Sequence, residues 1–335
     1  MLRPLSIVLV TALLNSCNSQ SLRPSASGPD SVTEGLVSAE RVLRFFFHYG
    51  FELRDLPAGA KWMRAWIPAP NQDQVQQSEL VSLEAPVPSQ QRFEATHGNR
   101  YLYFESALPI DKPLRWHLVW QITRQQLSDA ITTEPVADQY LGPNQNVPID
   151  GKVRALTHRA RLVQGTDLQR ARQLYDFVLQ RMSYAKHGTG WGRGDAVWAC
   201  DSRYGNCTDF HSVFIGMSRA RKIPAKFEMG FPLPYAGTEG TIGGYHCWAK
   251  FHDGQRGWYG VDISEADKNP SLAKYFFGRL HARRVHFTTG RDLVLVPNQD
   301  GPPLNYFIYP YVEIDRKVHA GIDQKFSFDS LSVLD

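Results

Sequence analysis

The chain has 335 residues, a length that predicts two domains. Hydrophobic residues make up 42% and charged residues 21%, which is ordinary for a globular protein and excludes a disordered or fibrous chain. The 37 basic and 33 acidic residues give a net charge of +4, too even for a dedicated nucleic-acid binder. Four cysteines are too few for a disulfide scaffold.

The first residues predict export. An apolar run at residues 5–14 follows one early positive charge and precedes a small residue, the pattern of a secretory signal. Residues 14–17, Leu-Asn-Ser-Cys, resemble a bacterial lipoprotein box, so residues 1–17 are interpreted as a signal peptide and Cys17 as a lipidation candidate. Plain cleavage nearby, with an incidental Cys17, is the alternative. Residues 18–39 are rich in Ser, Pro and Gly and predict a flexible tether. We expect an exported protein of a bacterial envelope, either periplasmic or anchored in the membrane.

Residues 40–125 carry a period of two. Apolar and polar residues alternate most clearly over 114–123, and residues 62–67 and 100–104 follow the same pattern. Such alternation predicts a half-buried antiparallel sheet, here a small all-β sandwich domain. The polar residues 126–150 predict a linker.

The period then changes to that of a helix. Thr166 and Gln169 form a capping-box pattern, and apolar residues at steps of three and four predict an amphipathic helix over 167–182. The glycine-rich residues 188–195 lack the Gly-Lys-Ser/Thr ending of a phosphate loop and are interpreted as the wall of a cleft.

Cys207 stands where another helix is predicted to begin. The apolar residues between Phe210 and Met217 define its buried face, Asn206 is the expected N-cap, and Asp209 falls at the third helical position. Free backbone N–H groups at a helix start, together with a protonated histidine, lower a thiol pKa from about 8.5 to roughly 3.5–7.5. The alternative is that Cys207 is a small buried hydrophobic residue.

A cysteine nucleophile needs a base and a group that orients it. Residues 244–251 predict a strand on which His246 lies on the face opposite Cys247, away from the apolar layer. Residues 257–263 predict a second strand that carries Asp262. Two adjacent strands could place His246 and Asp262 side by side, which is the geometry of a nucleophile–base–orienter set.

Three motifs surround these residues. They are Gly-Asn-Cys-Thr-Asp at 205–209, Tyr-His-Cys-Trp-Ala at 245–249 and Val-Asp-Ile-Ser-Glu-Ala at 261–266. In this order and on these predicted elements they resemble the transglutaminase-like superfamily, which shares its catalytic logic with papain-type cysteine proteases. The resemblance covers about residues 151–300.

The resemblance implies an α+β fold. It implies a papain-like core in which the helix that carries the nucleophile packs on an antiparallel sheet, preceded by the β sandwich. It also implies Cys207 as the nucleophile, His246 as the general base and acid, and Asp262 as the orienting carboxylate. Residues 301–335 are expected to form a C-terminal strand, at 304–309, that docks on the core, followed by a tail.

The oxyanion hole is expected to use the Cys207 backbone N–H and a second donor. Animal transglutaminases use an upstream Trp indole for this purpose. Trp191, Trp198 and the Asn206 side chain are the options here, with Trp191 ranked first, although core packing is the alternative role for each Trp. His211 lies one turn beyond the cysteine and either lines the cleft or is a hydrogen-bonded core histidine. No spacing resembles a zinc or calcium site, so neither metal nor cofactor is expected.

Three kinds of function remain open. The first is a cysteine acyl-transfer enzyme acting on a peptide or protein, with release by water (a peptidase or amidase) favoured over transfer to an amine (a transglutaminase). The second is a non-catalytic binding or scaffold module of the envelope. The third is that the fold is wrong and that Cys200, Cys207 and Cys247 are structural disulfide partners, in which case Cys207 is not a nucleophile. Neither the substrate nor a pairing of Cys200 with Cys247 can be fixed from the sequence.

Overall fold

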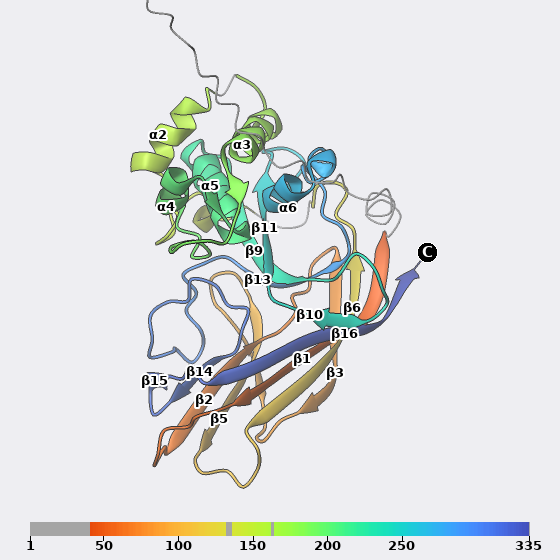
Figure 1. The fold of residues 1–335 in the computed structure, drawn as a ribbon, viewed down its shortest axis with the longest axis vertical. Helices are drawn as coiled ribbons and strands as arrows, with labels where there is room; N and C mark the ends of the chain where they lie inside the picture. Colours follow the sequence, from red (N-terminus) through yellow and green to blue (C-terminus); the bar gives the residue numbers. More distant parts are fainter. Residues whose placement is uncertain (1–40, 132–135, 162–163, 335) are drawn as a thin grey trace, which may run out of the picture.

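The computed structural model describes residues 41–131, 136–161 and 164–334 (Figure 1). The predicted signal peptide, Cys17 and the tether lie outside these residues. Figure 1 shows a β-rich half and a half in which the helices gather against one further sheet.

The β-rich half consists of two antiparallel five-stranded sheets. The first has the order β10 (Gly240–Ile242), β16 (Ile322–Leu334), β1 (Val42–Leu53), β6 (Arg115–Gln125), β3 (Gln76–Glu84). The second has the order β15 (Lys317–Val318), β14 (Tyr311–Ile314), β2 (Trp62–Pro68), β5 (Arg100–Ala107), β4 (Gln90–Phe93).

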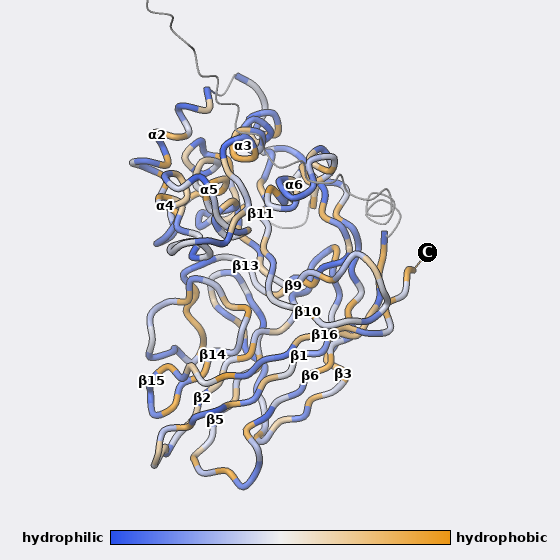
Figure 2. Tube along the Cα trace, viewed as in Figure 1, coloured by the Kyte–Doolittle hydropathy of each residue, from blue (hydrophilic) through white to orange (hydrophobic). Residues whose placement is uncertain are grey.

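Aromatic side chains fill the space between the two sheets. Alternate residues of β1 and β6 are buried, and Figure 2 shows hydrophobic and hydrophilic residues alternating along these strands. The Phe51 ring of β1 stacks on Trp116 of β6 at 4.6 Å between centroids, and Phe104 of β5 meets the same indole edge-on at 6.0 Å. The predicted β sandwich is confirmed.

The end of the chain completes this sandwich. A strand at residues 304–309 is the wrong prediction, because this stretch forms no strand and makes only an isolated bridge at Leu304. Prolines flank it on both sides and remove ladder N–H donors, so its apolar residues are buried without strand pairing. The later segments β14 and β16 pair instead with β2 and β1, so the tail belongs to the N-terminal sheets.

The other half places helices on a four-stranded antiparallel sheet. The sheet has the order β12 (Trp258–Val261), β11 (His246–His252), β9 (Ala225–Pro232), β13 (Arg284–Thr289). The helices are α2 (Gly151–Arg159), α3 (Asp167–Arg181), α4 (Ala196–Ser202), α5 (Cys207–Ala220) and α6 (Ile263–Lys268), with short 3-10 turns η1 (Asp138–Tyr140) and η2 (Pro270–Leu272) and a parallel pair β7 (Ser183–Tyr184) and β8 (Tyr204–Gly205). The predicted α+β class is confirmed, and the helix predicted at 167–182 is α3, with its Thr166–Gln169 capping box formed.

Both faces of the four-stranded sheet are buried. Helix α5 covers one face, where Cys247, Ala249 and Phe251 meet the apolar core as predicted. The predicted linker covers the other face, because its Leu127 and Ile131 pack with Trp248 and Trp258 in a separate apolar cluster. The described part of this segment is therefore anchored, by backbone bridges from Leu127 to Leu280 and from Ile131 to Trp258.

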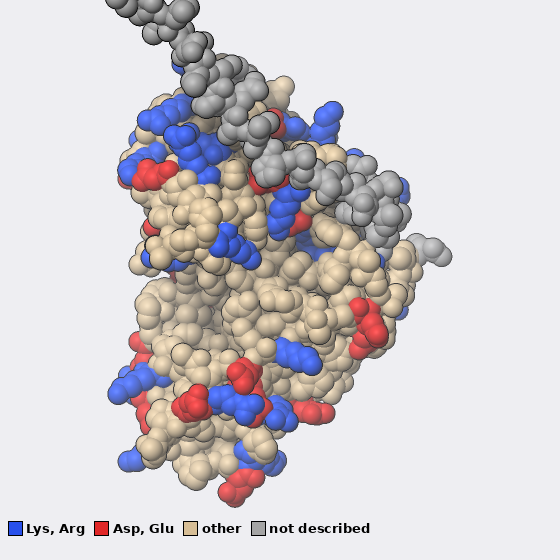
Figure 3. Space-filling view, in the orientation of Figure 1, with Lys and Arg blue, Asp and Glu red and all other residues tan. Residues whose placement is uncertain are grey.

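The surface agrees with the even charge balance of the sequence. Figure 3 shows Lys and Arg over the helical end, mixed charges over the β-rich end, and a largely uncharged band between them. Among the described residues, no helix is both long and apolar enough to cross a membrane.

Gly230 allows strand β9 to lie against β13. A Cβ at this position would lie 1.7 Å from the Val285 carbonyl oxygen, a backbone atom that cannot rotate away. We therefore expect Gly230→Ala to lower the free energy of unfolding by about 3 kcal/mol in denaturant titrations. Gly243→Ala, where a Cβ meets nothing within 4 Å, is the matched control and should stay within about 0.5 kcal/mol of the parent. Equal stabilities for the two variants would contradict the close strand packing.

Candidate active site

The first turn of α5 carries Cys207. The Asn206 side chain accepts a hydrogen bond from the Thr208 N–H at 3.0 Å, so the predicted N-cap is confirmed. The Asp209 carboxylate accepts a hydrogen bond from the Asn206 N–H at 2.9 Å, which completes a capping box. Among the described residues, the Cys207 N–H has no hydrogen-bond acceptor. The Cys207 N–H and the positive end of the α5 dipole can therefore both stabilise negative charge at the thiol.

A glycine-rich loop closes over this helix start. The Asp209 carboxylate also accepts hydrogen bonds from Gly192 N–H at 2.7 Å and Gly194 N–H at 3.0 Å. Both glycines have positive φ, 82° and 61°, a conformation that other residues rarely adopt. The Asp209 carboxylate thus holds the loop against α5 and caps the start of that helix.

His246 and Asp262 lie next to each other beside the thiol. His246 Nε2 is 2.7 Å from Asp262 Oδ2, and the two residues are 6% and 0% exposed. Strands β11 and β12 are adjacent, as predicted. Asp262, however, is not a strand residue. It follows β12 as the N-cap of α6, and its Oδ1 accepts hydrogen bonds from the Glu265 N–H and the Ser264 hydroxyl.

Electrostatics at this site favour an ion pair. Burial raises the pKa of the Cys207 thiol, but hydrogen bonds from Cys247 and His246 and the positive charge of His246 outweigh it, so that this pKa lies well below its usual range. Burial lowers the pKa of His246, yet the charge and hydrogen bond of Asp262, with those of Cys207, raise it to about 9. A thiolate beside an imidazolium is the resulting state near neutral pH.

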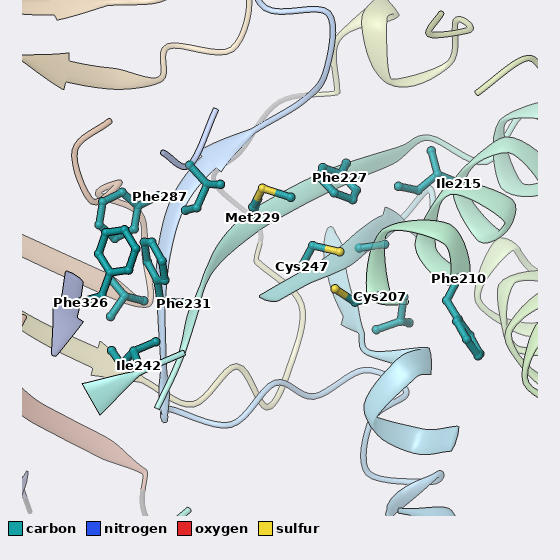
Figure 4. Packing of buried hydrophobic residues seen from close by; sticks show 14 of the residues in the cluster. Cys207, Phe210, Ile215, Phe227, Met229, Phe231, Ile242, Cys247, Phe287 and Phe326 are labelled. Carbon is teal, nitrogen blue, oxygen red and sulfur yellow. The ribbon is translucent and has the colours of Figure 1, made fainter. Parts of the chain in front are cut away.

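A second cysteine and a second histidine lie next to Cys207. Figure 4 shows the sulfur atoms of Cys207 and Cys247 near one another between α5 and β11, within the apolar cluster. His211 donates from Nδ1 to the Cys207 carbonyl at 2.7 Å, and its Nε2 accepts from the Ile263 N–H at 3.1 Å. His211 is therefore the hydrogen-bonded core histidine that was one of its two expected roles, and burial lowers its pKa.

The candidates for the second oxyanion donor have different surroundings. The Asn206 side-chain amide donates to the Tyr245 hydroxyl at 3.0 Å, so one of its two N–H groups is already used. Trp191 lies in the glycine-rich loop, with the Lys186 ammonium 5.9 Å from its ring. Trp198 packs edge-on against Tyr204, below Gly190. The assignment of this donor stays a prediction.

Sequence reasoning missed two residues behind the carboxylate. Arg284 Nη2 donates to Asp262 Oδ2 at 3.1 Å, and it also lies 2.9 Å from His281 Nε2. The sequence held a signal for Arg284, because polar residues alternate with Val285 and Phe287 along β13, and both faces of that strand are buried.

Cys200, Cys207 and Cys247 are all free thiols. Among the residues with described positions, no group of three or more His, Cys, Asp or Glu side chains could hold a metal ion.

The site thus consists of a buried cysteine at a helix start, a histidine at the start of strand β11 and an aspartate that follows strand β12. Residues 154–263 match the family model of the transglutaminase-like superfamily. The chain therefore contains a transglutaminase-like domain, as the three motifs predicted.

Individual proteins share parts of this chain. A Haemophilus influenzae protein described as uncharacterized is 28% identical over 227 residues, which cover 58% of this chain and 62% of that protein, so the match spans about three fifths of the relative. A solved Cytophaga hutchinsonii protein described as a candidate cysteine protease has 12% identity and a TM-score of 0.48, covering 86% of this chain and 98% of that one. The periplasmic domain of TgpA from Pseudomonas aeruginosa has 16% identity and a TM-score of 0.37, covering 74% and 95%.

The ion pair predicts an unusual thiol titration. Alkylation of Cys207 by iodoacetamide, mapped by mass spectrometry, should follow a pKa well below that of an ordinary thiol, because His246 and Cys247 stabilise the thiolate. In His246→Ala the Cys207 titration should move to higher pH, because the imidazolium charge is lost and burial remains. Cys200 serves as an internal control, since burial raises its pKa to about 11 and it should stay unreactive. A Cys207 titration unaffected by His246→Ala would contradict the ion pair.

Proposed function

We propose that this protein is a cysteine acyl-transfer enzyme that hydrolyses an amide bond of a peptide or protein. The observation that supports this most is the buried array in which Cys207 contacts His246 and His246 Nε2 lies 2.7 Å from Asp262. Burying the Cys207 thiol, the Asp262 carboxyl group and the His246 imidazole together costs free energy unless their charges compensate one another. Ionisable groups with perturbed pKa values of this kind are concentrated at functional sites.

The proposed reaction has two halves. The Cys207 thiolate attacks the amide carbonyl carbon, the C–N bond breaks, and the His246 imidazolium gives its proton to the departing amine, which leaves a thioester on Cys207. The neutral His246 then takes a proton from water, whose oxygen attacks the thioester and releases the acid and the thiolate. Asp262 keeps the imidazole oriented through both halves.

Water is the proposed acceptor because little space is left at the sulfur once it carries the acyl group. Cys207 is 3% and His246 is 6% exposed even before the substrate binds, and a peptide that has entered would occupy the way in. Water is the smallest acceptor available. Transfer to an amine shares the first half of the reaction and is the outcome that would correct this part of the proposal.

Turnover should depend on Cys207. We expect Cys207→Ser to lower the rate of amide cleavage by at least about 10³-fold, because a serine hydroxyl is not ionised by this site. Cleavage of quenched-fluorescent peptides and incorporation of dansylcadaverine into a glutamine peptide should be measured together. Cys200→Ser, at a free cysteine of α4, is the matched control and should keep the parent rate.

The two assays separate the possible functions. Cleavage that exceeds amine incorporation supports the hydrolase, and the reverse result makes the protein an amine transferase. Folded protein that shows neither activity, nor acylation of Cys207 by an activated ester, would overturn the enzyme proposal in favour of a binding module.

The pH profile should fall on the alkaline side near the histidine value. His246 acts as an acid only while protonated, and its pKa is raised to about 9, so kcat/KM for an amide should decline as the pH rises through about 9. A decline centred near 6.5, the usual histidine value, would show that Asp262 does not hold the proton on His246.

We also propose that the protein is exported and anchored by a lipid on Cys17. The support is the apolar run and the Leu-Asn-Ser-Cys pattern of residues 14–17. Metabolic labelling with alkyne-palmitate in a Gram-negative host should label the parent protein and Cys200→Ser, but not Cys17→Ser. Equal labelling of all three proteins would remove the anchor from the proposal.

A further inference from the structure

We propose that Arg284 is a positioning residue which, by sharing the Asp262 carboxylate with His246, keeps His246 able to release its proton. This proposal rests on the acyl-transfer function proposed above. Arg284 Nη2 donates to Asp262 Oδ2 at 3.1 Å, the same oxygen that lies 2.7 Å from His246 Nε2. The carboxylate is thus bound from two sides by cations, one fixed and one that titrates.

Packing alone does not explain an arginine at this position. Arg284 is 0% exposed, and its Nε and Nη1 atoms have no hydrogen-bond partner among the described residues. Its guanidinium lies 4.7 Å from the centroid of the Trp248 ring, a contact that stabilises the cation without replacing those hydrogen bonds. Replacing a buried ion pair by well-packed apolar side chains often leaves the stability of a protein unchanged or raises it. A gain in folding stability therefore does not explain a buried arginine with unpaired donors.

The second contact of Arg284 leads away from the site. The same Nη2 donates to His281 Nε2 at 2.9 Å, which requires an unprotonated nitrogen there. Burial and the neighbouring charge of Arg284 hold the pKa of His281 well below its usual range, so this ring stays neutral. The Tyr235 hydroxyl lies 3.3 Å from both His281 Nε2 and Glu265 Oε2 and continues the chain of contacts. His281 therefore holds Arg284 in place without adding a charge.

Other titratable or charged side chains also face Asp262 and Arg284. From the helices, they are Cys207 and His211 of α5, Tyr175 of α3, and Glu265 and Lys268 of α6. From the strands and loops, they are Cys247, His281, Tyr235, Tyr275 and Arg124. Among all of these, Arg284 is the cation that directly contacts the carboxylate oxygen bound by His246.

The sign of the effect follows from the order of the charges. Cys207, His246, Asp262 and Arg284 alternate negative, positive, negative, positive. A fixed positive charge on Asp262 repels the imidazolium and takes part of the carboxylate's hydrogen bonding, so it weakens the hold on the His246 proton. Without Arg284, Asp262 would have the imidazolium as its principal counter-ion, and His246 would be a poorer acid for the leaving amine.

The first test reads the histidine without any substrate. Cys207 alkylation should be followed from pH 4 to 11 in the parent, Arg284→Met and Arg284→Lys, since its rate changes again when His246 loses its proton. We expect this alkaline inflection to rise by about one pH unit in Arg284→Met and to stay near the parent value in Arg284→Lys, which keeps the charge. Arg219→Met is the matched control and should leave the inflection unchanged, because Arg219 is also a buried arginine but bonds Ala225, Gly142 and Asn144.

The second test separates the proton donor from general damage. Amide cleavage should fall about three- to tenfold in Arg284→Met, whereas acylation by a p-nitrophenyl ester, whose leaving group needs no proton, should change less than twofold. An unchanged inflection in folded Arg284→Met, an equal shift in Arg219→Met, or equal losses on amide and ester would overturn the role of Arg284.

Failure of the proposed function gives a different result. In that case the parent protein itself lacks the low-pH alkylation of Cys207 and ester acylation. If Arg284→Met does not fold, as judged by circular dichroism, Arg284→Gln replaces it against Arg284→Lys with the same expected difference.

Discussion

The Asp262 carboxylate joins parts of the chain that are far apart in sequence. One oxygen begins helix α6 by accepting from the Glu265 N–H, while the other binds His246 of β11 and Arg284 of β13. Its position is fixed further because the Asp262 N–H donates to the Phe276 carbonyl. A fully buried carboxylate is tolerable only when such partners compensate its charge, and these partners in turn orient the imidazole beside the thiol.

The environment of this carboxylate is supplied by both halves of the molecule. Helix α5 closes one face of the four-stranded sheet, and the segment that joins the two halves closes the other through Leu127 and Ile131. Because both faces exclude water, the charges at the site act through a low dielectric and perturb one another strongly. The described part of the connecting segment thus joins the β sandwich to the sheet that carries His246.

Much of this could be predicted from sequence. The start of α5, its Asn206 cap and the pairing of His246 with Asp262 follow from local periodicity, capping preferences and three motifs. Partners distant in sequence could not be predicted in the same way. The pairing of β16 with β1, the burial of the connecting segment and the Arg284 contact all depend on which surfaces meet in space, and alternation along one strand does not name the residue opposite. The strand expected at 304–309 failed for a related reason, since burial of apolar residues there does not require a ladder.

The position of β16 has a consequence for how this chain folds. Its residues Ile322–Leu334 lie between β1, at the start of the described chain, and β10, a short strand contributed by the other half. The ladder between β1 and β16 therefore joins segments separated by almost the whole described length. Closing so long a loop has a large cost in conformational entropy. During synthesis, β1 is complete long before β16 is made. Until β16 has been synthesised, β1 has one unpaired edge, and the half that contains the four-stranded sheet must fold without that ladder.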